Sequence, residues 1–196
     1  QEVRDALKQV DAALRLARIE KLYQTALAAE KTENWEQALN AYLEVLKIDQ
    51  TIQFALDGEQ RSVEQIQIAK RINYFLEKPD ILTSDLQLQN AIRLINAATQ
   101  INPKGAQLTS QLEKLSQLVQ DAQTPIKVTI ASDNLTDVAV YKVAKLGRFS
   151  TKELNLRPGT YVVVGARDGY QDVRQKIVIK AGQQPTHITI ICKVKL

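Results

Sequence analysis

The sequence predicts an α+β protein with two domains: a helical domain over residues 1–123 and a small antiparallel β-sandwich over residues 124–196. In the first part apolar residues recur with helical spacing, and in the second they alternate with polar residues as in strands. Five of the seven glycines lie beyond Pro125, where the turns of a sandwich need them. Because the residue before a proline favours extended backbone, Thr124 marks the change from helix to strand.

Composition fits folded domains rather than a disordered or membrane-spanning chain. The 196 residues are 44% hydrophobic and 24% charged, and no run of about 18 apolar residues is present. Methionine is absent even at position 1, which indicates a processed or excised chain, so a signal or membrane anchor would precede Gln1. From Pro125 onward, 12 Lys and Arg stand against 5 Asp and Glu, a net charge of +7. The remainder has 14 against 17, a net charge of −3, so the basic excess belongs to the β-domain.

About five helices are expected in the first domain, and the first covers residues 1 to about 30. Its apolar residues alternate at spacings of four and three, with no Pro or Gly between them: Val3, Leu7, Val10, Leu14 and Ala17. This pattern is typical of a coiled-coil seam or a stalk, through which the protein could form a homo-oligomer. The alternative is a single amphipathic helix that packs on its own chain.

Capping signals open two of the following helices. Asn34 is expected to cap a helix over residues 35–49, with Gln37 reaching back to it, and Ser84 to Gln87 repeats this arrangement. A long helix over residues 51–77 and a loop around Pro79 separate the two. A last helix is expected over about residues 104–121.

These helices resemble tetratricopeptide repeats. Ala38 and Tyr42 stand at the small and aromatic positions of one helix pair, and Ala91 and Pro103 at the small position and the closing proline of another. Ala38 and Ala91 are 53 residues apart, whereas these repeats recur about every 34 residues. The resemblance implies two helix pairs with an enlarged spacer, which would bind a partner protein. Trp35, the only tryptophan, is expected to pack on a neighbouring helix, with a role in binding as the alternative.

Six short strands are expected in the second domain. Their ranges are 126–132, 137–144, 149–157, 160–166, 172–180 and 186–195. Pro158 and Gly159 predict a type II turn in which Gly159 has a positive φ, and Asp168–Gly169 predicts a second turn.

The succession of a strand, Pro-Gly-x-Tyr, a strand and Gly-Tyr resembles the PEGA family of small β-domains. The resemblance covers residues 125–196. It implies a non-catalytic module of a bacterial cell envelope on the extracytoplasmic, periplasmic side, and it implies no particular ligand. The membrane would be reached only through an anchor upstream of Gln1.

The residue inventory argues against an enzyme, a metal site or a cofactor. His187 and Cys192 are five residues apart, so strand alternation places them on opposite faces, with Cys192 in the core and His187 exposed. Structural zinc needs four ligands, and the chain has one His and one Cys. No glycine-rich phosphate-binding loop is present.

The basic residues of the β-domain, with one aromatic neighbour, are the candidate binding residues. They are Arg148, Arg157, Arg167, Arg174, Lys176 and Tyr170. Strand alternation puts Arg174 and Lys176 on one face, opposite Ile177. Such a face attracts anions, including an acidic envelope polymer, but charge on an outer strand also serves solubility. Nucleic acid is not expected, because no aromatic stacking platform is evident.

Three functional hypotheses follow from these patterns. The first is a non-enzymatic scaffold of the bacterial envelope, whose helices bind a partner protein and whose β-domain contacts envelope material or another protein. The second is a binding module for an anionic ligand or polymer. The third is an accessory or regulatory part of a larger enzyme.

Overall fold

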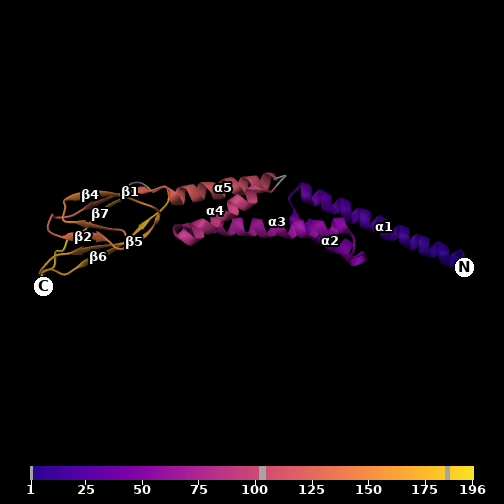
Figure 1. The fold of residues 1–196 in the computed structure, drawn as a ribbon, viewed down its shortest axis with the longest axis horizontal. Coiled ribbons are helices and arrows are strands. Elements are labelled where there is room, and N and C mark those ends of the chain that lie inside the picture. Colours follow the sequence, from indigo (N-terminus) through magenta and orange to yellow (C-terminus); the bar gives the residue numbers. More distant parts are fainter. Residues whose placement is uncertain (1, 102–104, 184–185) are drawn as a thin grey trace. The chain divides into compact units, whose positions relative to one another are not determined.

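The computed structural model describes residues 2–101, 105–183 and 186–196. Within these residues, five α-helices and one 3₁₀ helix precede seven β-strands (Figure 1), which confirms the α+β class. The chain forms two compact units. We call Gln1–Glu77 with Leu94–Lys114 the helical unit, and Lys78–Arg93 with Leu115–Leu196 the sandwich unit.

Three consecutive helices form the core of the helical unit. They are α1 (Glu2–Lys31), α2 (Trp35–Ile48) and α3 (Gln53–Glu77). Small buried residues, among them Ala26, Ala38 and Ala55, lie where these helices meet and let their backbones approach closely. Ala38 and Tyr42 are buried as the repeat-like pattern predicts.

The predicted cap of α2 is present with one difference. Asn34 accepts a hydrogen bond from the backbone N–H of Gln37 at 3.2 Å, which confirms it as the capping residue. The Gln37 side chain accepts from the Asn34 side-chain amide at 3.0 Å. In a capping box the Gln37 side chain would accept from the backbone N–H of Asn34. Here that N–H donates to the carbonyl of Ala29.

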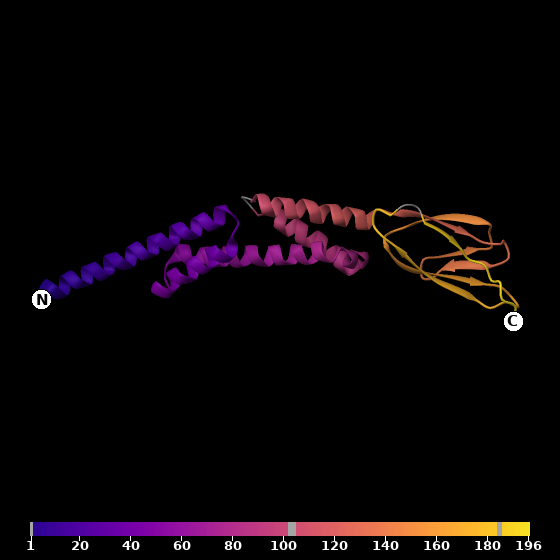
Figure 2. The same cartoon turned by 180° about the vertical axis from the view of Figure 1, so that it is seen from behind.

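The apolar residues in the first half of α1 are not covered by the described residues of the helical unit. The predicted apolar residues of this helix are all exposed: Val3, Leu7, Val10, Leu14 and Ala17. Figure 2 shows this half of α1 running past the ends of α2 and α3. The alternative of an amphipathic helix lying on neighbouring helices is therefore wrong for this half.

The remaining helices are η1 (Pro79–Thr83), α4 (Asp85–Thr99) and α5 (Ala106–Gln123). The loop expected around Pro79 is thus a short 3₁₀ helix. Ala91 is fully buried in α4, whereas Pro103 lies outside the described residues. No helix in the described ranges is both long and apolar enough to cross a membrane.

A polar cluster joins α1, α2 and α3 around the hydroxyl of Tyr42. This hydroxyl donates to Glu30 at 2.9 Å, and Arg61 donates to the same carboxylate oxygen at 2.7 Å and 3.1 Å. Burial, followed by the hydrogen bond and the negative charge of Glu30, raises the pKa of Tyr42 from 10.0 to about 12.

This raised pKa predicts a loss of stability in alkali. Because the pKa of Tyr42 is higher in the folded than in the unfolded chain, its contribution is complete below pH 10 and lost as the pH rises toward 12. We expect the melting temperature of the helical unit, followed by Trp35 fluorescence, to fall over this interval. Tyr42→Phe has no phenol to ionise, so its melting temperature should fall less steeply there. Parallel curves for the two proteins would contradict the prediction.

The sandwich unit contains two sheets. One has the order β4–β1–β7 and the other β3–β2–β5–β6. The strands of the first are β1 (Ile126–Ala131), β4 (Thr151–Leu156) and β7 (Thr186–Thr189). Those of the second are β2 (Asp137–Val140), β3 (Ala144–Gly147), β5 (Gly159–Ala166) and β6 (Val173–Ile179). All pairs are antiparallel except β1 with β7, which run parallel.

The apolar faces of the two sheets share one core, as a sandwich requires. Val128 and Ile130 of β1 lie in the same buried cluster as Val138 of β2 and Val163 of β5. Along β6, Ile177 and Ile179 are buried while Arg174, Lys176 and Val178 are exposed, which confirms the predicted alternation.

Two predicted strands have limits that differ from the observed ones by more than two residues. The range 137–144 is not one strand, because the chain turns at Tyr141–Val143, where Lys142 has a φ of 58° and the N–H of Val143 donates to the carbonyl of Val140. The range 186–195 is a strand only as far as Thr189. Beyond it, Lys195 forms an isolated bridge with Tyr170.

The predicted φ of Gly159 is wrong. Gly159 is the first residue of β5, pairs with Ile179, and is not among the glycines with positive φ. Gly169, by contrast, has a φ of 77°, which confirms the second predicted turn. Pro158 is buried. The Pro-Gly pair therefore leads directly into a strand instead of closing a type II turn.

The sandwich unit also includes helical segments. The change from helix to strand falls between Gln123 and Ile126, where the sequence predicts it. However, the compact unit also takes in residues 78–93 and 115–123. Arg157 lies 2.9 Å from Asp85 of α4 and ties one of these segments to the strands. A cut at residue 124 would remove part of the unit.

Candidate functional site

A hollow in the helical unit lies beside Trp35. It has a volume of about 360 Å³ and is bordered by the start of α2, the middle of α3 and the start of α5. Five side-chain amides line it: Asn34, Gln65, Asn73, Gln107 and Gln111. Its apolar lining comes from Trp35, Ile66, Ala69 and Leu108. The hollow therefore combines hydrogen-bond donors and acceptors with an apolar floor.

A second hollow of about 600 Å³ shares Glu33, Trp35 and Gln65 with the first. Its other lining is more charged and includes Arg61 and Glu64. The indole of Trp35 is half-buried, as packing on a neighbouring helix predicts, and it also lines both hollows. The two interpretations of Trp35 are thus compatible.

Glu33 holds the start of α5 against the α1–α2 turn. Its carboxylate accepts from the backbone N–H groups of Gln107 at 2.7 Å and Leu108 at 3.0 Å. These are N–H groups at a helix N-terminus, which has unpaired donors and favours negative charge. Gly105 leaves the space for this contact, because a Cβ there would lie 2.0 Å from the Glu33 carboxyl carbon. The wall of the hollow is fixed in this way.

A second contact fixes the far end of the hollow. The Gln111 side chain of α5 donates to the Asn73 side chain of α3 at 3.0 Å. Gln65 and Gln107 have no side-chain hydrogen bond to another described residue. The hydrogen-bonding groups of these two amides are therefore not used by other described side chains.

The structure does not gather the predicted basic residues into one site. Arg157 pairs with Asp85. Arg167 lies 3.5 Å from Asp133 and stacks 4.1 Å above the ring of Tyr170, so both are engaged within the unit. Arg174 and Lys176 are exposed on β6, at one edge of their sheet. Arg148 follows β3, at the opposite edge.

Asp133 organises the loop that Arg167 contacts. Its carboxylate accepts from the backbone N–H groups of Leu135 at 3.0 Å and Thr136 at 2.8 Å. The bond from Thr136 is the main reason that the pKa of Asp133 lies below its usual range. This carboxylate therefore serves the turn and does not offer a free acid or base.

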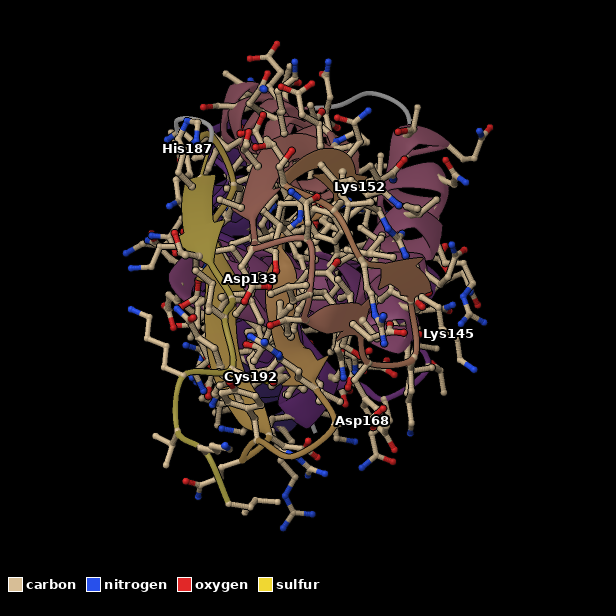
Figure 3. The ribbon with its side chains drawn as sticks, turned by 90° about the vertical axis from the view of Figure 1, so that its left-hand side faces the viewer. Asp133, Lys145, Lys152, Asp168, His187 and Cys192 are labelled. Atoms are coloured by element: carbon tan, nitrogen blue, oxygen red, sulfur yellow. The ribbon has the colours of Figure 1, made fainter. Side chains whose placement is uncertain are left out.

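His187 and Cys192 do not form a reactive pair. His187 is exposed on β7, whereas Cys192 is 1% exposed and its thiol donates to the carbonyl of Gly165 at 3.3 Å. Figure 3 places them well apart on the sandwich unit. Both predicted environments are confirmed. Across the part of the chain that the structure describes, no three His, Cys, Asp or Glu side chains are grouped as metal ligands.

Comparison with known proteins gave no match, either to a protein-family model or to a curated protein sequence. The resemblances to tetratricopeptide repeats and to the PEGA family therefore stay predictions from motifs.

The sequence did not point to Glu33 or to the amides of the hollow. Glu33 is 74 residues from Gln107 along the chain, and no local pattern links them. The only available signal was Trp35 itself, an indole at the start of a capped helix.

Proposed function

We propose that this protein is a non-enzymatic interaction scaffold that binds an extended segment of a partner protein in the hollow beside Trp35. The observation that carries the proposal is a half-buried tryptophan that lines two hollows, with five amide side chains around the hollow of about 360 Å³. Amides can donate to and accept from a peptide backbone whatever its sequence. An indole supplies a large, rigid contact area at small entropic cost.

The walls of the hollow support this role because they are fixed before binding. Glu33 attaches α5 to the α1–α2 turn, and Gln111 bonds to Asn73. A pre-formed site avoids the cost of ordering loops when the partner arrives.

For the sandwich unit we propose contact with envelope material or with another protein. The PEGA-like motif over residues 125–196 supports this role and an extracytoplasmic location, with an anchor upstream of Gln1. Binding of an anionic polymer has less support, because Arg157 and Arg167 already pair with carboxylates.

Trp35 makes the proposal testable, since it is the only tryptophan of the chain and its emission reports on its own surroundings, which include the hollow. Peptides selected from a random phage-displayed library on the intact protein should change Trp35 fluorescence when titrated. Ala69→Arg places a long side chain in the hollow and should weaken their binding by roughly tenfold or more. Gln67→Arg adds the same charge to α3 at an exposed position outside the hollow, and should leave the binding unchanged. Peptides that bind Ala69→Arg equally well and leave the emission unchanged would overturn the proposal.

A further inference from the structure

The first half of α1 carries an apolar stripe that its own unit leaves uncovered. Its members, which we call the α1 seam, are Val3, Leu7, Val10 and Leu14, and they are 74%, 59%, 55% and 63% exposed. Polar contacts with α2 begin further along the helix, where Arg15 donates to the carbonyl of Ile48 at 3.0 Å. Among the described residues of the helical unit, nothing covers this helix face, and the contacts of α2 with α1 begin only beyond Leu14.

The residues beside the seam differ on its two sides. The seam spacing of four, three and four assigns its members to the alternating core positions of a heptad repeat. Arg4 and Asp11 then flank one side, and Ala6 and Ala13 the other. Neither Arg4 nor Asp11 forms an ion pair with any residue that the structure describes.

We propose that α1 forms an antiparallel two-helix coiled coil with α1 of a second copy of this chain. Val3 packs against the partner's Leu14 and Leu7 against the partner's Val10, and the two-fold axis repeats both contacts. This register sets Arg4 beside the partner's Asp11. The two-fold axis places Asp11 beside the partner's Arg4, so two equivalent ion pairs form. Ala6 faces the partner's Ala13, which lets the two backbones approach closely on that side.

The charges disfavour the other arrangements. A shift of one heptad in the antiparallel pair brings Asp11 beside the partner's Asp11 and Arg4 beside the partner's Arg18. A parallel pair sets Asp11 beside the partner's Ala6 and leaves Arg4 without a carboxylate. Like charges at flanking positions are a common device for excluding such alternatives. In the proposed register, the apolar residues of the seam pack together and the flanking charges are opposite in sign.

The folded parts of the two copies are also compatible with this register. Because the contacts of α2 with α1 begin at Arg15, beyond Leu14, an antiparallel arrangement keeps each α2 beyond the end of the partner's seam. The surface is separate from the hollow beside Trp35, so failure of this proposal would leave the proposed function untouched.

Sedimentation of the intact chain tests the association. With rising concentration the apparent mass should increase from 22.0 kDa toward twice that value. Leu7→Glu should keep the protein monomeric at every concentration, and its circular dichroism should stay unchanged because Leu7 is exposed in the monomer. Leu56→Glu is the matched control: this leucine is 39% exposed on α3, away from the seam, and the variant should still dimerise. A monomeric wild type, or a dimer that survives Leu7→Glu, would overturn the proposal.

A charge exchange tests the register. Arg4→Asp alone, or Asp11→Arg alone, creates two like-charge contacts and should raise the dissociation constant roughly tenfold. The double variant Arg4→Asp with Asp11→Arg restores both pairs in reverse and should dimerise like the wild type. A double variant as weak as either single one would rule out the antiparallel register described above.

Discussion

Gly165→Ala should destabilise the sandwich unit by about 1–3 kcal/mol, the usual cost of forcing an extra methyl group into a packed core. Gly165 lies in β5, where a Cβ would stand 2.7 Å from Cγ2 of Ile190 and 2.8 Å from Cγ2 of Thr136. Both of these residues are fully buried. Thr136 is also held in place, because its hydroxyl oxygen accepts from the N–H of Cys192 at 3.1 Å. Moving Ile190 or Thr136 away from the added methyl group would therefore cost free energy.

Gly159→Ala is the matched control in the same strand. A Cβ there would lie 3.5 Å from the ring of Tyr161, an ordinary contact distance, and the φ of Gly159 is not positive. We therefore expect the free energy of unfolding of this variant to lie within about 0.5 kcal/mol of the wild-type value. Urea unfolding followed by far-ultraviolet circular dichroism in the β region gives both values. Equal effects of the two substitutions would contradict the packing account of Gly165.

The β half contains features that could be predicted from the sequence and others that could not. Alternation in residues 173–179 correctly assigned the buried face of β6, because side-chain direction in a strand follows directly from residue spacing. The backbone angle of Gly159 depends on its pairing with Ile179, which is not a local property. The turn at Lys142 contains neither Gly nor Pro, so the residues that usually indicate a turn are absent there.

The helical half shows the same division between local and distant contacts. The cap at Asn34 was predictable from spacing within one helix, and the packing of Tyr42 from the resemblance to a tetratricopeptide helix. The attachment of α5 by Glu33 was not, because it joins segments far apart in sequence. The candidate site beside Trp35 is built mainly from such distant contacts. The sequence therefore indicated its indole but not its walls.

Gly58→Ala should destabilise the helical unit by roughly 2–3 kcal/mol, although alanine is the better helix former. In α3, a Cβ at this position would lie 2.3–2.5 Å from Cζ, Cε2 and Cε1 of Tyr42. The ring is 1% exposed, and its hydroxyl is bonded to Glu30, so it has no room to move aside. The clash should thus exceed the gain of about 1 kcal/mol in helix propensity.

A double-mutant cycle separates these two effects. Tyr42→Leu keeps an apolar side chain but lacks the Cε and Cζ atoms that a Cβ at position 58 would meet. In this background Gly58→Ala should stabilise the helical unit by about 1 kcal/mol, as helix propensity alone predicts. Urea unfolding followed by Trp35 fluorescence supplies the four free energies, and their coupling should reach about 3 kcal/mol. The same destabilisation by Gly58→Ala in both backgrounds would show that the ring of Tyr42 is not what requires glycine in α3.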